Sequence, residues 1–150
     1  MKTAADITVG LFASMQQAVA GFRSLPADSP ELKTFIFTGN RVPFLPRDAL
    51  WSGYLNLGLQ KIDGAYLTEI FHIAYEKEGF RYAFAASGSI TYDVGGRFYF
   101  GDENQPDGTP AHNWSDAAHA VAYWDAISSK ERGNWYLRFG PDGKPLPQQI

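Results

Sequence analysis

The segment 101–113 gathers carboxylates and an imidazole within a few residues of one another. Its acidic residues are Asp102, Glu103 and Asp107, and His112 follows them. Carboxylate oxygens bind hard cations such as Mg²⁺, and a nearby imidazole can act as a general base or acid. We therefore predict a site in which Asp102, Asp107 and His112 are catalytic. In that site Asp102 and Asp107 also bind Mg²⁺.

The same segment also suits a solvated turn, because Asp, Asn, Gly and Pro are the residues that turns use. An EF-hand is excluded, since Gly108 falls at the seventh position instead of the sixth and the closing glutamate is missing. Both interpretations, a functional loop and a plain turn, stay open at this point. The other two histidines, His72 and His119, are predicted on solvated helix faces.

Composition excludes several classes of chemistry. The 150 residues contain no cysteine, so disulfides, cysteine-bound zinc and thiol nucleophiles are ruled out. No Gly-x-Ser-x-Gly motif is present, nor any glycine-rich phosphate loop of the P-loop or Rossmann type. The chain has no apolar run of the roughly 18 residues that a transmembrane helix needs, and no secretory signal peptide is recognisable.

The formal net charge of −3 is unevenly distributed along the chain. No lysine or arginine occurs between Arg97 and Lys130, whereas five carboxylates fall in that stretch. An acidic segment repels phosphate unless a cation intervenes, so a basic nucleic-acid-binding patch is not expected. A bound metal would reconcile this segment with an anionic substrate.

Hydrophobic periodicity predicts the elements that must position these groups. Apolar residues at helical spacing predict helices at 3–23, from Asp63 to Gly79, and from Ser115 onward. In the third helix the residues predicted to face inward are Ala117, Val121, Trp124 and Ile127. Alternating or β-rich runs predict strands at 34–38, 51–59, 80–92, 97–100 and 134–139.

These elements predict an α+β fold with a mainly antiparallel sheet and about three helices. The strongest alternation, between Phe80 and Asp93, runs through Gly88 and then turns at Gly95 and Gly96 into a hairpin. The Pro- and Ser-containing stretch after Ser24 predicts a peripheral N-terminal helix or connector at 1–24. A single domain is then predicted at 31–150.

The order of features from about residue 48 to residue 140 resembles the catalytic domain of colicin M-type bacteriocins. The resemblance is carried by the runs 48–53, 55–59 and 88–100, followed by an acidic segment with a histidine. It implies a toxin that cleaves the peptidoglycan precursor lipid II with Mg²⁺, between undecaprenol and pyrophosphate.

The family motif is Asp-x-Tyr-Asp, five residues, then His-Arg, and this sequence departs from it. Asp102 matches the first aspartate and His112 the histidine, with one extra residue between them. Asp107 matches the second aspartate only with a shift, the tyrosine is absent, and Asn113 replaces the arginine. The resemblance is therefore to a divergent or inactive relative.

Two functional hypotheses follow. The first is a bacterial toxin-like cell-envelope hydrolase that cleaves a phosphate-containing, lipid-linked peptidoglycan precursor with metal assistance. Such a toxin would be delivered to the periplasm of a target cell. The second is a non-catalytic binding module, such as an inhibitor, immunity protein or accessory domain, which acts on a protein partner. In either case the chain can be an excised domain of a longer protein.

Overall fold

The computed structural model describes residues 4–27, 32–39, 42–44, 55–87, 91–92, 98–99, 116–140 and 142–145. Within these residues the chain alternates between helices and strands. In chain order the elements are α1 (Ala4–Ser24), β1 (Thr34–Gly39), η1 (Val42–Phe44), α2 (Leu55–Ala74), η4 (Glu76–Glu78), β2 (Arg81–Ser87), β3 (Thr91–Tyr92), β4 (Phe98–Tyr99), α3 (Asp116–Ser128) and β5 (Tyr136–Phe139).

The main sheet is parallel, so the prediction of a mainly antiparallel α+β fold is wrong. Three strands lie in the order β1-β2-β5, and both neighbouring pairs are parallel. A separate two-stranded pair, β3 and β4, is antiparallel, as the hairpin prediction expected. Parallel neighbours need a long crossover, and the segments before β2 and before β5 each contain a helix. Alternation within a strand reports which faces are buried and carries no information on strand direction.

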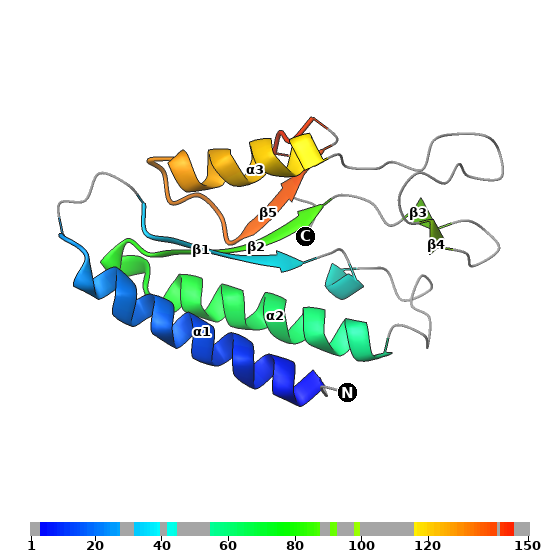
Figure 1. Ribbon diagram of the computed structural model, residues 1–150, viewed down its shortest axis with the longest axis horizontal. Helices are drawn as coiled ribbons and strands as arrows, with labels where there is room; N and C mark the ends of the chain where they lie inside the picture. The colour runs from blue at the N-terminus through cyan, green and yellow to red at the C-terminus, as the bar shows by residue number, and fades with distance from the viewer. Residues whose placement is uncertain are drawn as a thin grey trace.

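Helices cover both faces of the sheet (Figure 1). The α1 and α2 helices lie together on one face, and α3 lies on the other. Because the strand order advances in one direction while α2 and α3 lie on opposite faces, the two crossover connections have opposite hands. The result is an α/β sandwich in which α1 and α2 cover one face of the parallel sheet and α3 covers the other.

The face of the sheet toward α2 carries the aromatic core. Phe35 pairs with Tyr82 and Phe37 with Phe84 across the β1–β2 ladder, so their rings project to the same side. Helix α1 adds Leu11, Met15 and Val19 to this core. The prediction that the N-terminal helix is peripheral is therefore wrong: Met15 is completely buried, and the Tyr82 hydroxyl donates to its carbonyl oxygen.

Helix α2 begins eight residues before the predicted N-cap at Asp63. The Asp63 carboxylate lies inside the helix and accepts a hydrogen bond of 2.6 Å from the Thr8 hydroxyl of α1. Residues 55–59, predicted as strand, are helical. The alternation of leucines there suits a strand and a helix equally, because short apolar runs cannot distinguish the two.

Helix α3 buries a stripe of alanines. Ala118, Ala122 and Ala126 recur every four residues and are buried, whereas the predicted inward residues Val121, Trp124 and Ile127 are exposed. The prediction of the inward face is therefore wrong. Hydrophobicity favoured the larger residues, but the alanines occupy the buried face.

None of the helices in the described part of the chain is long and apolar enough to cross a membrane, in agreement with the sequence-based expectation.

Two glycines make room for aromatic rings of the core. A Cβ atom built on Gly64 of α2 would lie 2.2 Å from the Phe37 ring, and one on Gly39 would lie 2.0 Å from the Phe84 ring. Both rings therefore occupy space that a side chain at these glycines would need. The close approach of α2 to β1 depends on the missing side chain of Gly64.

We expect Gly64→Ala to lower the free energy of unfolding by about 1–3 kcal/mol, because the added methyl group overpacks the core against Phe37. The matched control is Gly10→Ala in α1, where nothing lies within 4 Å of the added atom. It should raise stability by up to about 1 kcal/mol through helix propensity. Urea unfolding of both variants measures the difference. Equal effects would show that the α2–β1 contact is not tight.

Candidate functional site at the carboxyl edge of the sheet

The carboxyl ends of the three parallel strands lie along one edge of the sheet. They are Gly39 of β1, Ser87 of β2 and Phe139 of β5. In open α/β sheets, ligands bind in the crevice outside these ends. Helices α2 and α3 begin at this same edge (Figure 1). This carboxyl edge is thus the place to look for chemistry.

Lys61 of α2 reaches the carboxyl edge from one face. Its ammonium group donates a 3.0 Å hydrogen bond to the carbonyl oxygen of Thr38, and it lies 5.1 Å from the centre of the Phe37 ring. The side chain is half-buried, and this burial lowers the pKa of Lys61. Lysines with a lowered pKa at a cleft are common at functional sites. Sequence analysis missed this residue, although a lone lysine among Leu57, Leu59 and Ile62 was a visible signal.

Tyr123 of α3 reaches the same strand end from the opposite face. The Thr38 and Tyr123 hydroxyl oxygens lie 2.9 Å apart and share a hydrogen bond. Thr38 is thus bonded through its carbonyl to a helix on one side of the sheet and through its hydroxyl to a helix on the other. An ammonium group and two hydroxyl groups meet at the end of β1.

These groups can bind and orient polar ligands. An ammonium group has three N–H donors. Lys61 gives one of them to the Thr38 carbonyl oxygen, and another can be donated to an oxygen atom of a ligand. A hydroxyl pair can donate and accept, which suits a group that gains or loses a proton. The carboxyl edge can therefore hold a sugar hydroxyl or a carbonyl oxygen.

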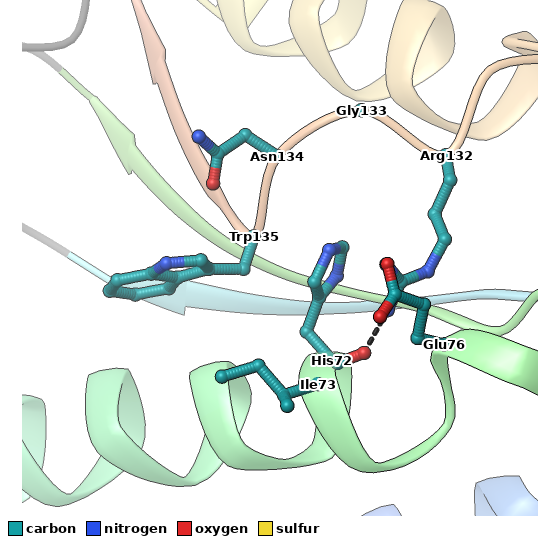
Figure 2. Close-up of a pocket in the computed structure, with 7 residues that line it drawn as sticks. All are labelled: His72, Ile73, Glu76, Arg132, Gly133, Asn134 and Trp135. Carbon is teal, nitrogen blue, oxygen red and sulfur yellow. Dashed lines mark hydrogen bonds and ion pairs between the residues drawn. The ribbon is translucent and has the colours of Figure 1, made fainter.

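A cavity of about 370 Å³ lies at the other end of α2 and is shown in Figure 2. Its lining includes His72, Glu76 and the segment 132–135. Figure 2 shows the His72 ring pointing from α2 toward that segment, with Arg132 beside it. The Arg132 guanidinium donates to the carbonyl oxygens of His72 and Phe80, and one of its nitrogens lies 3.7 Å from a Glu76 oxygen. It thereby caps the C-terminal end of α2.

His72 has a structural role in this cavity and is not on a solvated face as predicted. The residue is 7% exposed, and its Nδ1 lies 3.0 Å from the Tyr82 carbonyl oxygen. A carbonyl can only accept, so Nδ1 carries the proton and donates. Burial, helped by the nearby positive charge of Arg132, lowers the pKa of His72. The imidazole is thus held neutral as a link between α2 and β2.

His119 also departs from its predicted place on a solvated surface. Its ring packs edge-on against Phe139 of β5, with the ring centres 5.2 Å apart. Tyr123, one turn further along α3, makes a similar contact with Phe139 at 6.1 Å. The two α3 side chains therefore enclose the last residue of β5.

The predicted catalytic residues Asp102, Asp107 and His112 lie outside the described residues. Their convergence, and the binding of Mg²⁺ by Asp102 and Asp107, stay predictions. Among the residues that are described, no group of three or more His, Asp or Glu side chains could hold a metal ion. In the sequence the three predicted residues lie between β4 and Asp116, the first residue of α3.

Comparison with curated proteins finds a short-chain dehydrogenase/reductase of the fungus Cryptosporiopsis sp. that is 31% identical over 133 residues. The match covers 88% of this chain and 45% of that protein. The chain thus spans about half the length of this relative. No family model matches the chain, and no solved structure gives a significant match.

The printed name of this relative is that of an oxidoreductase and not of a hydrolase or a toxin. The predictions of a hydrolase, a toxin and an antimicrobial bacteriocin acting on lipid II are therefore wrong. The likeness also offers no support for the binding-module alternative. The parallel main sheet with helices on both faces is an α/β arrangement, whereas the order of a hairpin, a loop and a helix had suggested the bacteriocin domain.

The lowered pKa of His72 predicts a stability that falls with decreasing pH. Below the ordinary histidine pKa of about 6.5, the unfolded chain binds a proton on His72 that the folded chain resists. The free energy of unfolding should therefore be fully retained above that value. It should decrease as the pH falls toward the lower pKa of the folded state. Urea unfolding between pH 7.5 and about 5 measures this slope, and His72→Gln should reduce it. An unchanged slope in the variant contradicts the neutral, buried imidazole.

Proposed function

We propose that this chain supplies a nucleotide-binding edge of parallel strands in an oxidoreductase. The reaction is hydride transfer between a nicotinamide nucleotide and the carbon of a carbonyl or alcohol. The observation that carries the proposal is the ammonium group of Lys61 at the carboxyl edge of an all-parallel sheet. The printed name of the fungal relative, a dehydrogenase/reductase, supports the reaction class.

The fold supports a nucleotide ligand in part. Doubly wound sheets bind dinucleotides outside the carboxyl ends of their parallel strands, and β1, β2 and β5 end together at one such edge. The glycine-rich loop that cradles the pyrophosphate is absent from the sequence. Among the described residues, those that fit a nucleotide are at the carboxyl edge. When bound, a nicotinamide ring gives or takes the hydride.

The residues of the carboxyl edge have separate roles in this proposal. Lys61 donates its remaining N–H groups to a sugar hydroxyl, while its bond to Thr38 fixes the direction of the side chain. Half-burial strengthens these hydrogen bonds, since the local dielectric is lower than that of water. The Tyr123 hydroxyl, held by Thr38, offers a donor to a substrate oxygen on the other side of the strand end.

Binding of nicotinamide mononucleotide to the whole chain tests the proposal. In ¹⁵N NMR titrations, the amide signals of Thr38, Gly39 and Lys61 should shift with nicotinamide mononucleotide more than with adenosine monophosphate. The reason is that the proposal places the nicotinamide half of the nucleotide at these residues. Lys61→Met should weaken this binding by about tenfold or more, because hydrogen bonds from a charged donor are lost.

The matched control is Lys33→Met, at the opposite end of β1. The Lys33 ammonium is exposed and donates to the Leu25 carbonyl oxygen, so its removal should leave nucleotide affinity unchanged. The proposal is rejected if neither nucleotide shifts the signals of the carboxyl edge. It is also rejected if the two lysine variants lose affinity equally, which would indicate a general loss of positive charge.

A further inference from the structure

Arg81, the first residue of β2, is a buried cation at the amino edge of the sheet. Its side chain projects toward α3, and the residue is only 6% exposed. One guanidinium nitrogen, Nη1, donates a 2.8 Å hydrogen bond to the carbonyl oxygen of Ala126 in the last turn of α3. The Nε atom is buried and has no hydrogen-bond partner among the described residues.

No described carboxylate neutralises Arg81. The ion pairs between described residues join Arg23 to Glu78, Arg132 to Glu76 and Lys144 to Asp142. Burial lowers the pKa of Arg81, and the nearby charge of a second cation, Arg132, lowers it further. A guanidinium remains protonated in proteins, so the charge is retained. Burial of a charge without a counterion is unfavourable.

A cavity of about 230 Å³ lies directly beside this cation. Arg81, Ser129, Gly133 and Leu137 are among the residues that line it. Gly133 has a positive φ of 58°, and a Cβ atom there would lie 3.4 Å from a guanidinium nitrogen of Arg81. The glycine thus keeps the space beside the guanidinium open. A water molecule takes about 30 Å³ of liquid volume, so the cavity has room for a ligand of several atoms.

The positive charge beside the cavity is buried, whereas the negative charges are exposed. Arg81 is buried, whereas Asp125 and Glu131, which also line the cavity, are exposed to solvent. Solvent screens the two carboxylates, while the guanidinium lies where the dielectric is low. An anion that enters the cavity therefore gains more from Arg81 than it loses to the carboxylates.

We propose that this cavity binds a small oxyanion, a carboxylate or a phosphate, which pairs with the guanidinium of Arg81. The planar guanidinium matches two oxygens of such an anion in a bidentate arrangement. The anion would supply both the missing countercharge and an acceptor for the Nε–H group. This site lies at the amino edge of the sheet, so it is independent of the nucleotide proposed at the carboxyl edge.

Titration of the whole chain with sodium acetate and with inorganic phosphate tests the proposal, with sodium chloride at equal ionic strength as reference. The readout is the Nε–Hε signal of Arg81 in ¹⁵N NMR, assigned by its absence in Arg81→Met. Acetate or phosphate should shift this signal in a saturable manner, and chloride should not. A shift with acetate alone identifies a carboxylate site, and one with phosphate alone a phosphate site. No saturable shift with either anion, or the same shift with chloride, overturns the proposal.

Variants separate the site from general charge effects. Arg81→Met should remove the rise in melting temperature that the anion causes, whereas Arg23→Met, at an exposed ion pair, should retain it. Because Arg81→Met also removes a cap of α3, a second variant keeps the cation. Asp125→Asn combined with Glu131→Gln should tighten anion binding about two- to fivefold by removing repulsion. Unchanged or weaker binding in this double variant contradicts an anion in the cavity.

Discussion

The parallel pairing of β1 with β2 is the constraint on which the rest of the molecule depends. Its register sets Phe35 beside Tyr82 and Phe37 beside Phe84, so four aromatic rings project to one face. Helix α2 can lie on that face only because Gly64 has no side chain where the Phe37 ring lies. The same pairing brings Thr38 to the edge of the sheet, where Lys61 of α2 reaches its carbonyl oxygen.

The two ends of the strands are used differently. At the amino edge, arginines satisfy the carbonyl groups that helices leave without partners: Arg132 at the end of α2 and Arg81 at the end of α3. These bonds fasten both helices to the sheet. At the carboxyl edge, Lys61, Thr38 and Tyr123 are less buried and hold one another at the surface. The amino edge therefore provides rigidity, and the carboxyl edge presents polar groups to a ligand.

Helix α3 is joined to the sheet by hydrogen bonds and by ring contacts. The Tyr123 hydroxyl meets the Thr38 hydroxyl of β1, and the Ala126 carbonyl oxygen accepts a hydrogen bond from Arg81 of β2. The rings of His119 and Tyr123 contact Phe139 of β5. The large apolar residues Val121, Trp124 and Ile127 are exposed, so the side chains that attach this helix are polar or aromatic.

The sequence by itself determined the existence of most elements. The apolar spacing of α1, the β-rich run of β1 and the alternation at β2 each match what the structure shows, because these signals depend only on local periodicity. The sequence also alternates between helix and strand, which is typical of parallel sheets. The hairpin predicted at Gly95 and Gly96 favoured an antiparallel sheet instead. The acidic segment drew attention for its composition, whereas Lys61 stands alone in an apolar run.

Only the tertiary structure decided strand direction, the buried face of α3 and the residues that meet at the carboxyl edge. Thr38 and Tyr123 are 85 positions apart, and Arg81 and Ala126 are 45 apart. No local pattern encodes such contacts, because they depend on which helix covers which face of the sheet. The burial of Arg81 and His72 follows from the same packing, since a polar residue near the end of an element can lie in solvent or beneath the next segment. Periodicity alone cannot distinguish those two environments.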